Sequence, residues 1–242
     1  MSQLKAFLNL THAVLEPGEM AEYLIQVPDK VWGIYALNRD PLCGRIDKTL
    51  AEKLISQALD CGKELAGHYI SLCKTNSPDQ IAEYLHVKVK KPQIPEEGGR
   101  ILFARFTEPD IIEVFSDALE KVTRLGCFPS FPKNGGEWED ILTAHELFHV
   151  VELRHEDEIF TRKKHITIFS IGSIQYRATV NALSEIAAMS FAREICGLAY
   201  LPFALDVMLT YGYQAEAAGE LFYEIRDIYE TYKNEMDHNG RT

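Results

Sequence analysis

The chain has 242 residues, 46% of them hydrophobic, so it is long enough to bury a substantial core. Its formal net charge of -11 argues against nucleic acid and anionic membrane surfaces as partners, because both favour clustered lysines and arginines. No apolar run reaches the roughly 18 residues of a membrane span. We expect a single domain over residues 1–242 that has no nucleic-acid or membrane partner.

The cysteines and the N-terminus indicate a cellular location. The five cysteines are odd in number, scattered, and without a C-x-x-C pair, which is typical of a reduced, intracellular protein. The first ten residues contain one lysine and a short apolar patch but no signal-peptide pattern. We therefore expect a cytoplasmic protein.

The first half of the chain predicts helices and a small β element. Residues 1–43 have the weakest pattern, with a short helix near 20–26, and we interpret them as an N-terminal arm, a lid or part of the core. Apolar residues at helical spacing predict a long helix over 46–73. Its expected buried stripe consists of Leu50, Leu54, Ala58, Cys61, Leu65, His68 and Leu72.

The next segments precede the most informative stretch. Ser77 and Pro78 are a typical N-cap and first helical residue, and they predict a short helix to about residue 86. Residues 100–106 and 111–115 are β-rich and flank a turn, so we expect a β-hairpin or two short strands. A helix from 111 to 126 also fits the periodicity.

Residues 143–152 contain His145-Glu146-x-x-His149 inside an apolar run. On an α-helix, residues four apart share a face, so His145 and His149 can bind one metal ion about 2.0–2.1 Å away. Glu146 lies beside them, where its carboxylate can take a proton from metal-bound water. The alternative is a pair of core histidines that are satisfied by hydrogen bonds. A preceding loop, 128–136, is expected to border a substrate cleft.

The run Thr-Ala-His-Glu-Leu-Phe-His resembles the active-site helix of zincin metallopeptidases. The resemblance implies that His145 and His149 are zinc ligands and that Glu146 is the general base. In gluzincins, a glutamate on a second helix some tens of residues downstream is the third ligand, and Glu185 is the candidate here. Zincins often have a small sheet before the motif helix, in agreement with the predicted hairpin.

The spacing around Glu185 also favours this role. We predict a helix from 174 to about 196 in which residues 178, 182, 185, 189, 192 and 196 form one stripe, mostly of small side chains. A lone carboxylate buried in that stripe would be costly, and a metal held by two histidines would compensate its charge. The alternative is an ion pair of Glu185 with Arg177 or Arg193.

Four more residues are auxiliary candidates. Glu152 lies on the same helical face as the two histidines. His155 and His165 belong to the charged run after the motif, which we expect to be a solvated helix end and loop. Either histidine, or Tyr176, could donate a hydrogen bond to an oxyanion at the metal.

The C-terminal part predicts two further helices, 200–211 with Pro202 in its first turn, and 214–235 with one apolar face. Together the elements predict a mainly α (α+β) fold. We expect a zincin-like helical domain with a small β-hairpin or sheet before the motif helix.

The expected function is that of a zinc-dependent hydrolase, a metallopeptidase with one Zn²⁺ per chain and a peptide or small-molecule substrate. Iron or manganese would also fit the ligand set. One alternative is a di-iron carboxylate (ferritin-like) oxidoreductase, because Glu146-x-x-His149 occurs in such bundles and Glu64, Glu152 and Glu185 could be ligands. Another is a non-catalytic metal-binding structural protein.

Overall fold

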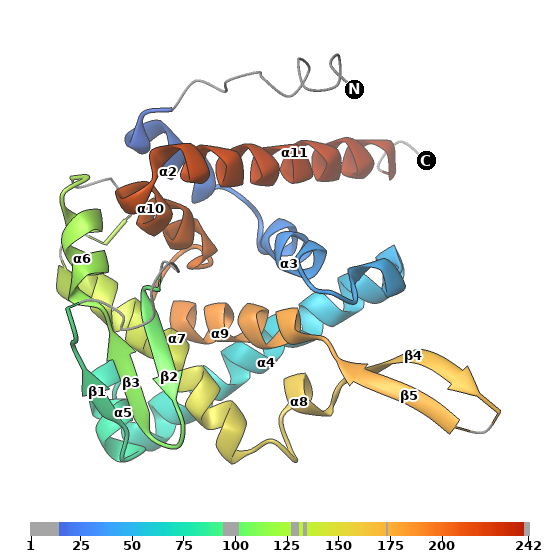
Figure 1. Ribbon diagram of the computed structural model, residues 1–242, viewed down its shortest axis with the longest axis horizontal. Helices are drawn as coiled ribbons and strands as arrows, with labels where there is room; N and C mark the ends of the chain where they lie inside the picture. Colours follow the sequence, from blue (N-terminus) through green and yellow to red (C-terminus); the bar gives the residue numbers. More distant parts are fainter. Residues whose placement is uncertain (1–14, 94–101, 127–130, 133–134, 173, 240–242) are drawn as a thin grey trace.

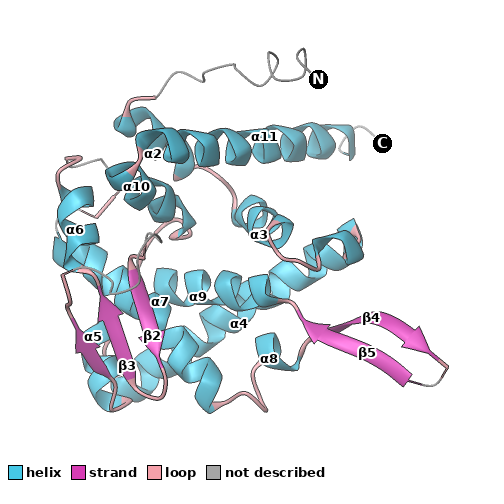
Figure 2. Cartoon of the chain, viewed as in Figure 1, coloured by secondary structure: helices cyan, strands magenta, loops and turns pink. Residues whose placement is uncertain are grey.

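The computed structural model describes residues 15–93, 102–126, 131–132, 135–172 and 174–239. The chain is mainly helical, as predicted, and has two small β-sheets, of which only the one before α7 was predicted (Figures 1 and 2). The helices are α2 (Pro17–Leu24), α3 (Asp29–Asn38), η1 (Cys43–Arg45), α4 (Lys48–Cys73), α5 (Pro78–Tyr84), α6 (Ser116–Thr123), α7 (Gly135–Arg154), α8 (Phe160–Lys163), α9 (Asn181–Cys196), α10 (Phe203–Tyr213) and α11 (Ala215–Asn239). The strands are β1 (Lys88–Lys90), β2 (Ala104–Thr107), β3 (Ile111–Val114), β4 (His165–Ile171) and β5 (Ile174–Thr179).

Helix α9 lies at the centre, with α4 and α7 both packed against it. At Gly62 of α4 the two backbones come so close that a Cβ atom would lie 2.1 Å from the carbonyl oxygen of Ala187. This approach corrects the predicted buried stripe of α4. After Ala58 the buried residues of α4 are Gly62, Ala66 and Tyr69, each one position later than the predicted Cys61, Leu65 and His68. Leu72, the last residue of the predicted stripe, is 46% exposed. The buried face differs from the prediction because α9 packs closely at Gly62.

The motif helix α7 is buried on several sides. Ala144, Leu147, Phe148, Val150 and Val151 are fully buried. A helix that is apolar beyond one stripe needs neighbours around it, and α7 has α9 on one side and α5, α6 and strand β2 on others.

Strand β2 forms the edge of the three-stranded sheet, whose order is β1-β3-β2. It pairs antiparallel with β3, with Ala104 opposite Val114, so the predicted hairpin is confirmed. The alternative prediction, a helix over 111–126, is wrong for 111–114, which form β3. It is confirmed for Ser116–Thr123, which form α6. Strand β1 pairs parallel with β3.

The predicted helix over 174–196 is wrong in its first part. Residues 174–179 form β5, which pairs antiparallel with β4 in a hairpin that projects away from the helices (Figure 1). Ala178, expected on the helical stripe, lies opposite Ile166. The segment has no helical apolar face to bury, since Gln175, Tyr176 and Arg177 are all exposed, and the strand before it supplies backbone hydrogen bonds. The helix begins at Asn181.

The described part of the N-terminal region contributes to the core. Met20 and Leu24 of α2 and Val31 and Trp32 of α3 are fully buried. Residues 1–14 lie outside the described part, so the arm or lid expected there remains a prediction for them. Across the described ranges, the buried apolar residues other than Phe115 form one connected cluster. None of the described helices is both long enough and apolar enough to cross a membrane.

Candidate metal centre

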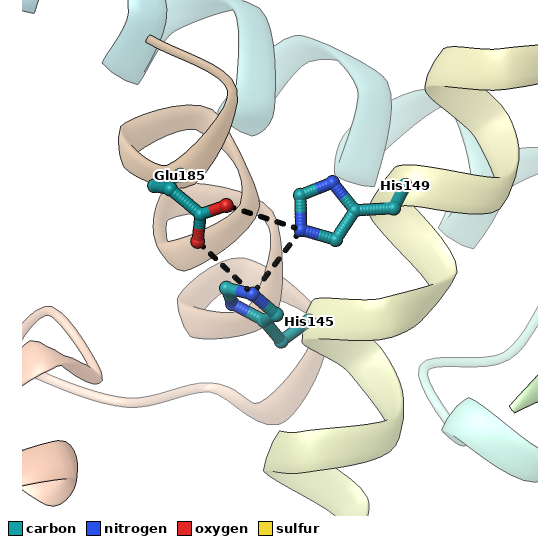
Figure 3. Close-up of side chains that lie close together, drawn as sticks. All are labelled: His145, His149 and Glu185. Carbon is teal, nitrogen blue, oxygen red and sulfur yellow. Dashed lines mark hydrogen bonds and ion pairs between the residues drawn. The ribbon is translucent and has the colours of Figure 1, made fainter. Parts of the chain in front are cut away.

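Two adjacent helices bring the three predicted ligands together (Figure 3). α7 supplies His145 and His149, and α9 supplies Glu185. The Nε2 atoms of the two histidines are 3.2 Å apart. Glu185 Oε2 lies 3.5 Å from His145 Nε2, and its Oε1 lies 3.8 Å from His149 Nε2. When one potential ligand atom is taken from each residue, the three atoms lie within 4.8 Å of one another.

The separations fit a small tetrahedral ion. Ligands about 2.0–2.1 Å from a tetrahedral zinc ion lie about 3.3–3.4 Å from one another, close to the separations above. Two imidazole nitrogens and one carboxylate oxygen are a ligand set that suits zinc. Among the described residues, no fourth His, Cys, Asp or Glu joins the cluster, so one coordination position is left for a water or a substrate.

Without a metal, His145 and Glu185 form a charged pair. Burial alone would lower the pKa of His145, but the hydrogen bond and charge of Glu185 raise it to about 9. Burial would likewise raise the pKa of Glu185, but the hydrogen bond and charge of His145 lower it. The Glu185 side chain is 51% exposed, so solvent reaches this face of the cluster. A metal ion would replace the proton that the pair shares.

The second histidine is oriented by a buried carboxylate. Ser184 Oγ donates its proton to Glu152 Oε2 at 2.9 Å. The Ser184 hydroxyl oxygen is therefore left to accept from His149 Nδ1–H at 3.3 Å. With the proton on Nδ1, the Nε2 lone pair faces the metal position. Such carboxylate-to-histidine contacts behind the ligands orient the ring and tune its basicity.

Glu152 is 1% exposed and is held by donors from α8 as well. Thr161 Oγ1 donates to Oε1, and the guanidinium of Arg162 lies 3.1 Å from Oε2. Burial would raise the pKa of Glu152, but its bonds with His149, Thr161 and Ser184 and the charge of Arg162 lower it. The carboxylate is therefore ionised at neutral pH. The sequence placed Glu152 on the correct face but did not identify its partners.

His145 lacks such support. Its Nδ1 is buried and has no hydrogen-bond partner among the residues that the structure describes. The two histidines thus differ. His149 has a partner behind its ring, whereas the polar contacts of His145 to described residues, with Glu185 and His149, are at its metal-facing Nε2.

Glu146 is 9% exposed and faces two cavities. Within the described ranges its carboxylate forms no hydrogen bond or ion pair. A buried carboxylate without a partner is costly, and here its position beside the cluster leaves both oxygens available to a small molecule. Glu146 thus lines the same cavities as the cluster, and its role as general base stays a prediction.

Two cavities adjoin the cluster. The apolar cavity, about 260 Å³, contains His145, Glu146 and Glu185. Its walls include Phe103, Trp138, Leu142, Met189, Leu205 and Leu209, and one more carboxylate, Asp206 of α10. The polar cavity, about 420 Å³, contains all three cluster residues and Glu146, and is bordered by Arg105, Phe106, Glu108 and Arg162.

The other auxiliary candidates are not in the cluster. His155 is exposed and pairs with Glu158, and His165 Nδ1 lies 2.8 Å from the carbonyl oxygen of Lys163. Tyr176 is 59% exposed and stacks on Phe169 on the projecting hairpin.

The carboxylates of the di-iron alternative are dispersed. Glu64 lines a different cavity, between α4 and the segment before α8. Both oxygens of Glu152 accept hydrogen bonds from hydroxyl groups. Within the described ranges, His145, His149 and Glu185 are the only group of three or more potential ligands. The geometry therefore favours one metal ion over two.

No protein-family model, curated protein or solved structure matches this chain. The likeness to zincins consequently depends on the motif residues and on the positions of their side chains.

Proposed function

We propose that the protein is a zinc-dependent hydrolase that cleaves amide bonds in peptides. The observation that carries the proposal is the convergence of His145, His149 and Glu185 on one point, with the unpartnered carboxylate of Glu146 facing the same cavities. A purely structural metal site would be closed by a fourth protein ligand. None is found among the described residues.

The roles of the residues follow from their positions. A zinc ion held here would act as a Lewis acid on a carbonyl group and would lower the pKa of water. Glu146 accepts a proton from the attacking water and can return it to the departing nitrogen. Glu152, through Ser184, keeps the His149 ring in the orientation and tautomer that ligation requires.

A peptide substrate is supported by strand β2. It pairs with β3 on one side and is the edge of its sheet. Ala104, Arg105 and Phe106 of this strand border the polar cavity beside the cluster. An extended peptide can add to such an edge by main-chain hydrogen bonds, which would place an amide next to the metal position.

Metal analysis and activity together test the proposal. Inductively coupled plasma mass spectrometry of protein purified without chelators should find one zinc per chain, and His149→Ala and Glu185→Ala should lose it. Glu146→Gln should keep the zinc and lose hydrolysis of a mixed peptide library. His155→Ala, which changes an exposed histidine on the same helix end, is the control. Two irons per chain would favour the di-iron alternative, and a metal-free protein or an active Glu146→Gln variant would refute the mechanism.

A further inference from the structure

Asp206 is a carboxylate that the proposed reaction does not use. It lies in the first turn of α10 and lines the apolar cavity together with His145, Glu146 and Glu185. Its side chain forms no hydrogen bond or ion pair with any described residue. Burial raises its pKa to about 7, against the opposing charge of His145. A carboxylate in this position has a desolvation cost that a bound cationic group would offset.

Asp206 is not a further ligand of the metal cluster. The potential ligand atoms that lie within 4.8 Å of one another belong to His145, His149 and Glu185 alone among the described residues. Asp206 instead lines the same cavity from a third helix, α10. A substrate group that fills this cavity would therefore adjoin both the metal cluster and Asp206.

The cavity combines apolar walls with a negative potential. Phe103, Trp138, Leu142, Met189 and Leu205 are among its walls. Its three carboxylates, Glu146, Glu185 and Asp206, outnumber the two charges of a zinc ion. Lysine and arginine side chains have this complementary character, because an apolar stem ends in a cationic group. An acidic side chain would be repelled, and an aliphatic one would leave Asp206 unpaired.

We propose that Asp206 is a specificity residue, and that the apolar cavity receives a lysine or arginine side chain next to the scissile amide. This inference rests on the proposed function, because the cavity adjoins the metal position. The stem of the basic residue packs against the apolar walls, and its cationic end donates to the Asp206 carboxylate.

Binding to a hydrolytically inactive protein tests the inference separately from turnover. The zinc-loaded Glu146→Gln protein would be titrated with two labelled hexapeptides, Ala-Ala-Lys-Lys-Ala-Ala and its norleucine analogue, which has the same stem without the ammonium group. We expect the lysine peptide to bind about 10- to 100-fold more tightly. Adding Asp206→Asn should remove most of this preference. Asp227→Asn, at an exposed carboxylate on α11, is the matched control.

Three results would overturn the specificity role. They are equal binding of the two peptides, an equal loss for both peptides in Asp206→Asn, and loss of zinc from Asp206→Asn. The last would make Asp206 a positioning residue for the metal. If Asp206→Asn does not fold, as judged by thermal unfolding, Asp206→Ser replaces it. Failure of the proposed function is seen separately, as a wild-type protein that hydrolyses neither peptide nor any member of a peptide library.

Discussion

Replacing Glu152 with Gln tests whether the carboxylate behind His149 serves the metal or only the fold. Gln keeps the shape, but it offers one acceptor oxygen where Glu152 offers two, and it has no charge. The Thr161 and Ser184 hydroxyls both donate to this carboxylate. Hydrogen bonds to charged groups contribute about 1.5–3 kcal/mol and neutral ones about 0.5–1.5. For two bonds, unfolding should therefore become easier by about 1–3 kcal/mol. Arg162 adds little because it is 47% exposed.

The effect on the metal should be separate and measurable. Loss of a partner behind a ligating histidine typically lowers metal affinity by about 10- to 100-fold. Competition with a chromogenic chelator at pH 7 measures this change, and urea unfolding of the metal-free protein measures the change in stability. Glu158→Gln removes the charge from an exposed glutamate that pairs with His155 and should alter neither. Zinc affinity equal to wild type in a destabilised Glu152→Gln protein would refute the positioning role.

The pH dependence of this contribution has a definite sign. The pKa of Glu152 is lowered in the folded protein, so its stabilisation is present above the unfolded pKa of about 4.3 and is lost as the pH falls further. In Glu152→Gln, the difference in unfolding free energy from wild type should shrink on acidification below that value. A difference that is the same at neutral and acidic pH would contradict the assigned ionisation.

Three further predictions concern the metal-free protein and the helix contact. Because the pKa of His145 is raised to about 9, zinc binding at pH 7.5 should release about one proton. Calorimetry in two buffers with different ionisation enthalpies measures this release. A binding enthalpy that is the same in both buffers would contradict a protonated His145. The stabilisation from the same raised pKa is complete below about 6.5 and is lost as the pH rises to about 9, so the metal-free protein should unfold at lower urea concentration at pH 9 than at pH 6. Gly62→Ala places a Cβ atom 2.1 Å from the Ala187 oxygen and should destabilise the protein by at least about 1–3 kcal/mol. The control Gly67→Ala, on the same helix with open space around its Cβ, should stabilise the protein by about 0.5–1 kcal/mol. Equal denaturation midpoints for the two variants would refute the close contact.

The sequence was sufficient for the motif helix and its two histidines, because their relation is local and set by helix geometry. Glu185 was selected by a stripe whose first member, Ala178, lies in a strand. The selection nevertheless led to a residue of the cluster, since the part of the stripe around Glu185 is helical. The β4–β5 hairpin was missed because short β-rich segments and helical segments share residue types.

The residues around the ligands could not be predicted in this way. Thr161 and Arg162 reach Glu152 because α8 packs against α4 and α9. Asp206 occupies the first turn of a helix, where acidic residues are common for electrostatic reasons. Only the tertiary arrangement shows that it lines the cavity beside the metal cluster. The sequence therefore did not predict the contacts between residues that are far apart along the chain.

The contact at Gly62 also determines whether the backbone entropy of the metal centre is lost on folding or on metal binding. Helix α9 cannot shift towards α4, because its backbone already touches that of α4. Glu185 therefore extends from a segment whose main chain was ordered when the protein folded. Fixing one backbone residue costs about 1–2 kcal/mol, and a ligand on a flexible loop would lose that entropy on binding. In this protein the backbone entropy is lost on folding, so zinc binds to ligands whose backbones are already ordered.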